Sequence, residues 1–184
     1  MAELLLTPTH PLDGRDLPAE TAGIVALEPL AATVAVRAEG AAADAAAAFL
    51  GTTLPGPGSF SRTADGVVVW LGPDEFLVTS AGSGPDLERR LRETLRPHGG
   101  SAVDQSANRV GLSLTGPMVR DLLAGGCSID LHPRSFPPGS AVRTTLALAE
   151  VVLLAGDSGF TVLVRSSFAG YLADWFADAA LEYV

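Results

Sequence analysis

The chain has 184 residues, 47% of them hydrophobic and 18% charged, and its formal net charge is -9 at pH 7. This composition is typical of a folded domain with a buried core and excludes a disordered chain. The excess of 21 acidic over 12 basic residues excludes the positive surface that nucleic-acid-binding proteins need. Every basic residue is arginine, and the absence of lysine excludes Schiff-base chemistry and a P-loop.

Cysteine and histidine are too sparse to indicate a metal site. Cys127 is the only cysteine, so no internal disulfide can form, and His10, His98 and His132 lack a zinc-ligand spacing. We therefore expect no metal. The N-terminus has no positively charged segment, and no apolar run reaches the roughly 20 residues that a membrane span needs. The sequence predicts a soluble, cytoplasmic protein without a membrane partner.

Residues 1–30 contain four prolines, which prevent a long helix. These residues are predicted to form an arm that contacts a partner. Residues 31–184 are predicted to be one folding unit of two halves, 31–100 and 101–184. The first half is predicted to contain a strand at 33–39, a helix at 41–50, a hairpin of strands 66–71 and 75–79, and a helix that begins at Pro85. The second half is predicted to contain a strand at 109–114, a helix between Gly116-Pro117 and Gly125-Gly126, strands at 142–148, 151–154 and 160–164, and a final helix whose apolar stripe runs from Phe168 to Ala179.

The two halves resemble each other. Residues 71–79 and the helix after them parallel residues 154–164 and the final helix, so each half is predicted to run strand-helix-strand-strand-helix. This repeat predicts an α+β fold of two ferredoxin-like subdomains, each of which buries its sheet against the other.

The run from Gly125 to Pro133 gathers the only cysteine, an aspartate and a histidine. Cys127 could be a nucleophile with His132 as its base, or Asp130 and His132 could form an acid/base pair. A helix C-terminus disfavours a thiolate, and the prolines that follow restrict the backbone, so we favour a buried cysteine and a rigid connector. A second polar segment, 104–109, lies at a strand end. Its Arg109, together with Arg165, could bind a carboxylate or lie at a subunit interface.

The order of short strings in the second half resembles the gamma subunit of heterotetrameric sarcosine oxidase. The resemblance covers about residues 71–184. It is carried by Val103-Asp104-x-Ser106-Ala107-x-Arg109, Leu114-x-Gly116-Pro117, Asp121-Leu122-Leu123, Gly126-Cys127-Ser128-Ile129-Asp130-Leu131-His132-Pro133 and Arg165-Ser166-Ser167-Phe168-x-x-Tyr171-Leu172-x-x-Trp175.

The chain is also distantly similar to the folate-binding domain of aminomethyltransferases, through Asp104, Ser106, the strand 110–114 and Gly116-Pro117. Where those enzymes carry paired acids, this chain has Ala149-Glu150, and Arg165 replaces their asparagine. The alternative that this resemblance implies is an autonomous folate-binding or aminomethyltransferase-like protein. Its ligand would be held by Asp104, Arg109, Glu150 and Arg165.

The first resemblance implies a noncatalytic subunit that supports assembly of the oxidase. That complex oxidatively demethylates sarcosine to glycine, produces hydrogen peroxide and transfers the one-carbon unit to tetrahydrofolate. We expect FAD, FMN and NAD on other subunits, and the alpha, beta and delta subunits as partners, with alpha in direct contact. No catalytic residue is expected in this chain, and Asp130, His132 and Phe136 are predicted to lie at the partner interface. An independent homodimeric binding module is a third possibility.

Overall fold

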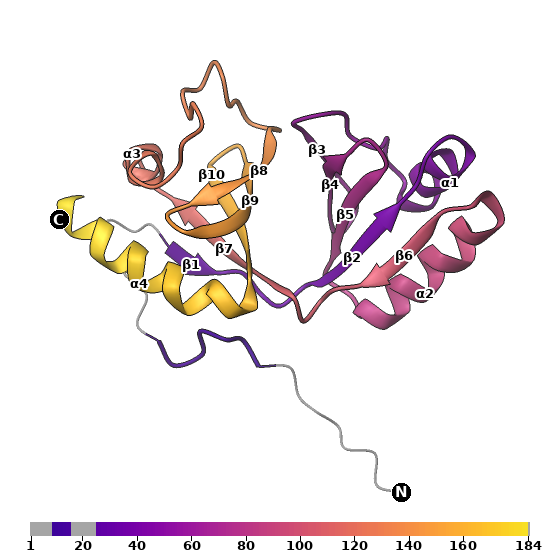
Figure 1. The fold of residues 1–184 in the computed structure, drawn as a ribbon, viewed down its shortest axis with the longest axis horizontal. Helices are drawn as coiled ribbons and strands as arrows, with labels where there is room; N and C mark the ends of the chain where they lie inside the picture. The colour runs from indigo at the N-terminus through magenta and orange to yellow at the C-terminus, as the bar shows by residue number, and fades with distance from the viewer. Residues whose placement is uncertain (1–8, 16–24, 184) are drawn as a thin grey trace, which may run out of the picture.

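The computed structural model describes residues 9–15 and 25–183. Two five-stranded antiparallel sheets form two lobes, and in each lobe the helices cover the outer face of the sheet (Figure 1). The inner faces of the sheets are turned toward each other. The α+β prediction is confirmed.

The first lobe has the strand order β3-β4-β5-β2-β6. Alternate residues of its central strands, such as Val34 and Val36, are buried in a core shared with the two helices. Its elements are β2 (Ala32–Arg37), α1 (Ala41–Leu50), β3 (Phe60–Arg62), β4 (Gly66–Gly72), β5 (Glu75–Ser80), α2 (Gly84–Leu95), a 3₁₀ turn (Arg96–His98) and β6 (Ser101–Asp104).

The second lobe has the strand order β1-β7-β10-β9-β8. Val110, Leu112 and Leu114 of β7 point into its core, where they pack with α3 and α4. Its elements are β1 (Val25–Leu27), β7 (Arg109–Thr115), α3 (Val119–Ala124), β8 (Ala141–Leu146), β9 (Ala149–Ala155), β10 (Gly159–Arg165), a 3₁₀ turn (Ser166–Phe168), α4 (Ala169–Ala180) and a final 3₁₀ turn (Leu181–Tyr183).

The two strand orders confirm the predicted repeat. When both sheets are read from the matching edge, the order β6-β2-β5-β4-β3 corresponds to β1-β7-β10-β9-β8. The second strands of these orders, β2 and β7, are each followed along the chain by a helix, α1 and α3. Each sheet contains two strands more than the three of the predicted unit, β3 and β6 in the first lobe and β1 and β8 in the second. Of these four, β8 corresponds to the strand predicted at 142–148. The sheets therefore share one topology.

The edge strands do not follow the predicted boundaries. β6 begins at residue 101, yet it pairs with β2 of the first sheet, while β1 lies within the predicted arm and pairs with β7 of the second sheet. Each sheet is thus completed by a strand from outside its own predicted half. Residues 1–8 and 16–24 of the predicted arm lie outside the described residues. In the remaining part, Leu12 is fully buried in the second lobe and Arg15 forms an ion pair with Asp174 of α4.

The inner faces are joined by backbone and side-chain contacts. Next to β3 and β8, the N–H of Phe60 donates to the carbonyl of Gly139 (3.2 Å) and the N–H of Ala141 donates to that of Gly58 (2.9 Å). A small apolar cluster also joins the lobes, and it consists of Val69, Leu77, Ala141, Val152 and Leu154. Two ion pairs cross between the lobes, Arg143–Glu75 (3.3 Å) and Arg62–Asp157 (3.2 Å).

The buried face of the final helix differs from the predicted apolar stripe. Leu172 and Phe176 are fully buried, whereas Phe168 is 41% exposed and Tyr171 38% exposed. Alanines at 169, 173 and 180 complete the buried face, so the helix lies close to the sheet at these positions. Alanine is a weak signal of burial in a sequence, and the prediction therefore placed the stripe one residue too far around the helix.

Candidate functional site

Cys127 is a core residue of the second lobe. Its side chain is buried, and its Sγ lies 4.0 Å from the hydroxyl of Thr144 on β8. Its N–H donates to the carbonyl of Leu123, which continues the turn at the end of α3. The structure thus places the thiol among apolar side chains, in agreement with the interpretation of Cys127 as a small buried residue.

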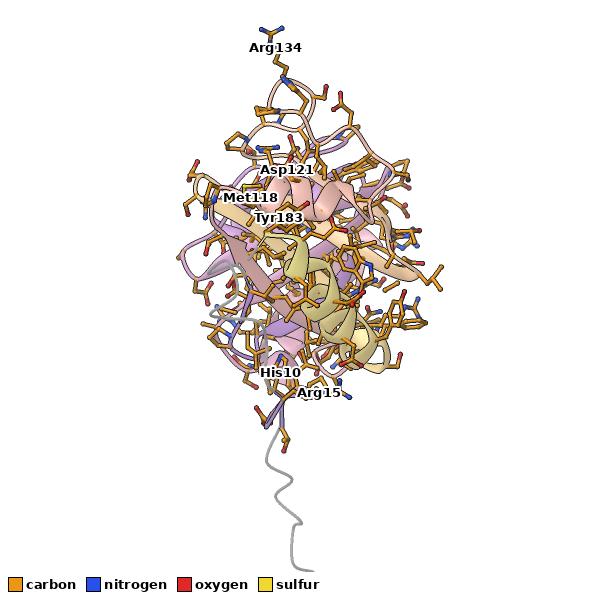
Figure 2. All side chains as sticks on the ribbon, turned by 90° about the vertical axis from the view of Figure 1, so that its left-hand side faces the viewer. His10, Arg15, Met118, Asp121, Arg134 and Tyr183 are labelled. Carbon is orange, nitrogen blue, oxygen red and sulfur yellow. The ribbon has the colours of Figure 1, made fainter. Side chains whose placement is uncertain are left out.

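Asp130 and His132 hold the connector in shape. The N–H of His132 donates to Asp130 Oδ1 (2.9 Å), and the hydroxyl of Ser135 donates to Asp130 Oδ2. The N–H of Arg134 donates to His132 Nδ1 (3.2 Å). Asp130 and His132 are exposed, and Arg134 projects from the tip of the loop (Figure 2). The polar groups of this motif are therefore used within the turn itself.

Phe136 is not the exposed residue that the sequence predicts. It is 6% exposed, and its ring stacks on Phe160 of β10 with the ring centroids 6.3 Å apart. The guanidinium of Arg120 lies over the Phe160 ring and donates to the carbonyl of Leu131. The loop folds back onto the sheet because this ring has an apolar site there. The expectation that the Phe136 ring is exposed is therefore wrong, while its place at the partner interface stays a prediction.

The hydrogen bonds to Asp130 predict its response to acid. The Ser135 hydroxyl, and then the N–H of His132, hold the pKa of Asp130 below its usual value. Because the folded-state pKa is depressed, the contribution to stability is complete above about pH 3.9 and is lost as the pH falls through the folded pKa. An NMR titration of the Asp130 carboxyl should give a midpoint below about 3.9, and Ser135→Ala should raise it. A wild-type midpoint at or above that value would contradict the hydrogen-bonded loop.

Asp104 lies at the end of β6, next to the first turn of α2. Its Oδ1 accepts hydrogen bonds from the N–H (3.0 Å) and the hydroxyl (2.5 Å) of Ser106. The Ser106 hydroxyl oxygen in turn accepts from the N–H of Thr33 on β2 (3.0 Å). Gly84, in the first turn of α2, lies so close that a Cβ there would be 2.2 Å from Ser106 Oγ and 2.7 Å from Asp104 Oδ1. The Asp-x-Ser string thus connects β6, β2 and the start of α2.

The other three residues of the predicted folate site lie near one another in the second sheet. Arg109 and Arg165 are directly opposite each other on β7 and β10, and Glu150 is on the neighbouring β9. Arg109 is only 8% exposed, whereas Glu150 and Arg165 are exposed. Burial lowers the pKa of the Arg109 guanidinium, and the positive charge of Arg165 lowers it further, while Glu150 opposes this shift. The structure therefore gathers Arg109, Glu150 and Arg165, and places Asp104 in the other sheet.

Arg109 is also affected by two charged residues that no sequence pattern indicates. Arg143 of β8 and Glu75 of β5 both contribute to its electrostatic environment, and they form an ion pair across the lobes. Glu75 also pairs with Arg37 (3.4 Å). These residues are distant in sequence, and nothing in their local pattern indicates that they meet.

The described residues contain no group of three histidine, cysteine, aspartate or glutamate side chains placed to hold a metal ion. Among the same residues, no helix has the length and apolarity to cross a membrane.

Comparison with known proteins gives one family. The sequence model of the "Sarcosine oxidase, gamma subunit family" matches residues 35–182. The chain is 42% identical over 170 residues to the sarcosine oxidase subunit gamma of Arthrobacter sp., covering 89% of this chain and 83% of the relative. It is 40% identical over 173 residues to the subunit gamma of Corynebacterium sp. (strain P-1), with the same coverage of each chain.

Two solved structures are similar in fold. A chain of the heterotetrameric sarcosine oxidase from Corynebacterium sp. U-96, in complex with pyrrole 2-carboxylate, superposes with a TM-score of 0.80 at 31% identity and covers 92% of this chain and 96% of its own length. The glycine cleavage system aminomethyltransferase T from Bartonella henselae superposes with a TM-score of 0.59 at 17% identity, over 83% of this chain and 44% of its own length. The second likeness concerns the fold alone.

Proposed function

Because this chain belongs to the sarcosine oxidase gamma subunit family, we propose that it acts as a noncatalytic subunit that supports assembly of the heterotetramer. The complex would oxidatively demethylate sarcosine to glycine, form hydrogen peroxide and pass the one-carbon unit to tetrahydrofolate. Its flavins and nicotinamide dinucleotide would be bound by other subunits. The alpha subunit would contact this chain directly, together with beta and delta in a cytoplasmic complex.

One observation carries the noncatalytic part of this proposal. In the strings that resemble the family, three side chains that could act in catalysis are bonded within the fold: Cys127 is buried against Thr144, Asp130 closes its own loop and Asp104 accepts from Ser106. Each of these groups has a structural role that accounts for its position. This supports a role for the strings in maintaining a shape that partners recognise.

Co-expression of the four subunits tests the assembly role. We expect omission of this chain to reduce recovery of the complex, measured by size-exclusion chromatography, and to reduce sarcosine-dependent oxygen consumption per alpha subunit. Complete assembly and full turnover without the chain would overturn the proposal. Adding the purified chain back should restore both quantities together.

The noncatalytic role is tested separately by Cys127→Ala in the assembled complex. We expect kcat to stay within about twofold of the wild type, whereas removal of a nucleophile lowers kcat by orders of magnitude. The isolated chain should lose only about 1 kcal/mol of stability, since the change removes one small buried group. A large loss of kcat with intact assembly would show that the thiol takes part in the reaction.

The alternative function is folate binding, and the gathering of Arg109, Glu150 and Arg165 is the observation that favours it. Calorimetry of the isolated chain with a reduced folate discriminates the two proposals. Specific binding that Arg109→Gln abolishes would support the alternative. We expect no such binding, because Asp104 lies in the other sheet and is bonded there to Ser106.

A further inference from the structure

A cavity of about 230 Å³ lies between the inner faces of the two sheets, and we call it the inter-sheet cavity. It is lined by residues of both lobes, among them Thr33, Val67, Thr79, Arg109, Leu154 and Leu163. Its wall is mainly apolar, with hydroxyl groups from the first sheet and one buried cation from the second. Sites for small molecules have this composition, in which a few polar groups orient a ligand within an apolar wall.

The buried cation is Arg109, and two of its nitrogen atoms have no hydrogen-bond partner within residues 9–15 and 25–183. The Nε and Nη1 atoms are buried, and neither has a hydrogen-bond partner among the described residues. A guanidinium has five N–H donors and stays protonated, so it cannot relieve this situation by losing a proton at neutral pH. Buried charges in proteins are normally paired, because an unpaired one is costly. The site therefore needs an acceptor that the described part of the chain does not supply.

The charges around Arg109 indicate the charge of that acceptor. Arg165 and Arg143 disfavour its positive charge, while Glu150 and Glu75 favour it. Counting Arg109, three cations face two anions, which leaves one positive charge in excess. Glu28 and Arg62 also line the wall of the cavity, and their opposite charges cancel in this count.

We propose that the inter-sheet cavity binds a small aliphatic monocarboxylate, held by the guanidinium of Arg109. A carboxylate is planar and accepts several N–H donors, which matches a guanidinium better than a spherical anion does. The side chains of Val67, Leu154 and Leu163 provide an apolar surface for a short aliphatic group. A folate is larger than this cavity, so the proposal does not require the alternative function above, although both use Arg109.

Thermal unfolding of the full chain tests this site. Acetate and propionate, compared with chloride at equal ionic strength, should raise the unfolding temperature of the wild type and approach saturation. Arg109→Gln should weaken the apparent affinity at least about tenfold, because hydrogen bonds to charged groups are lost. Arg109→Lys, which keeps the charge without the planar fork, should give an intermediate affinity. Arg134→Gln removes an exposed positive charge from the connector tip and should bind like the wild type.

Several outcomes would overturn the proposal. One is an equal, non-saturating effect of acetate and chloride, which would mean that water alone solvates Arg109. Another is an Arg109→Gln variant that acetate saturates at the same acetate concentrations as the wild type. A third is no acetate effect on the isolated chain combined with loss of complex recovery in Arg109→Gln, which would mean that a partner's carboxylate enters the cavity.

A second measurement applies if the Arg109 variants fail to fold. In the wild-type chain, titration with acetate should shift the NMR signals of the Thr33 and Thr79 methyl groups saturably, because both residues line the cavity. The signals of Leu181, which is 65% exposed at the C-terminal end, should not move. Saturable shifts confined to residues outside the cavity would contradict the site.

Discussion

Phe136→Ala is expected to lower the free energy of unfolding of the isolated chain by about 3–5 kcal/mol, the usual cost of removing a buried phenylalanine. The ring is almost fully buried, and it stacks on Phe160 beneath the connector. Loss of the ring would leave a cavity, and the loop could not collapse into it because Leu131 is held by Arg120. For a domain with a stability of about 5–15 kcal/mol this is a large effect. Urea unfolding followed by circular dichroism measures it.

The same variant separates a core role from an interface role. If Phe136 acts through folding, Phe136→Leu should recover most of the stability, and recovery of the oxidase complex should follow the stability of the variants. Arg134→Ala, at the exposed tip of the same loop, is the matched control and should unfold like the wild type. Wild-type stability of Phe136→Ala with a weakened complex would restore the interpretation of Phe136 as a contact residue.

The connector shows which part of the structure can be predicted from local sequence. Asp130 and His132 are followed by prolines, and those residue types account for a bonded turn without reference to the rest of the chain. The burial of Phe136 depends on Phe160, which lies on another strand. A loop phenylalanine near prolines has the same local pattern whether it is exposed or buried, so its position could not be predicted.

The hairpin of β8 and β9 illustrates a second limit. Residues 142–154 contain no glycine, proline, asparagine or aspartate, so the sequence predicts strands but no precise turn. The structure turns at Ala147, which has a φ of 50°. Ala147 donates its N–H to the Gly126 carbonyl, and the N–H of Leu148 donates to the hydroxyl of Tyr171. Contacts with distant elements therefore determine the turn, against local preference.

The repeat was predictable and the exchange of edge strands was not. Hydrophobic alternation and helix signals recur at similar spacing in both halves, and these signals determine the central strands. β1 and β3 each have three residues, too few to show a period. The sequence of β6 is compatible with a strand in either sheet, and only its pairing with β2 decides between them.

The candidate site was predictable in part for the same reason. Arg109 and Arg165 are predicted to be able to bind a carboxylate, and the pairing of β7 with β10 does bring them together. The resemblance to aminomethyltransferases places Asp104 in the same ligand site. The chain crosses from one sheet to the other between Asp104 and Arg109, and this crossing separates the two residues.

Gly84→Ala is expected to destabilise the chain by about 1–3 kcal/mol, the range for an overpacked buried position. Helix propensity alone would favour alanine in α2. The new Cβ would lie 2.2 Å from Ser106 Oγ, and that hydroxyl cannot move without losing its bonds to Asp104 and to the N–H of Thr33. The variant is therefore expected to weaken the contacts that hold β6 to β2 and α2. Urea unfolding should show the lower stability, and hydrogen exchange of the Thr33 amide should become faster.

Gly82→Ala is the matched control, because a Cβ at Gly82 would meet only Ser80 Oγ at an ordinary 3.5 Å. It should unfold within about 0.5 kcal/mol of the wild type, as expected for a surface change that breaks no specific contact. Ser106→Ala together with Gly84→Ala should cost less than the sum of the single changes, since removing the hydroxyl also removes the closest clash of the new Cβ. Additive losses, or a Gly84→Ala variant as stable as the wild type, would contradict the Asp-x-Ser string as the connection between the edge strand and the helix. The string would then be free for the ligand role that its resemblance to aminomethyltransferases implies.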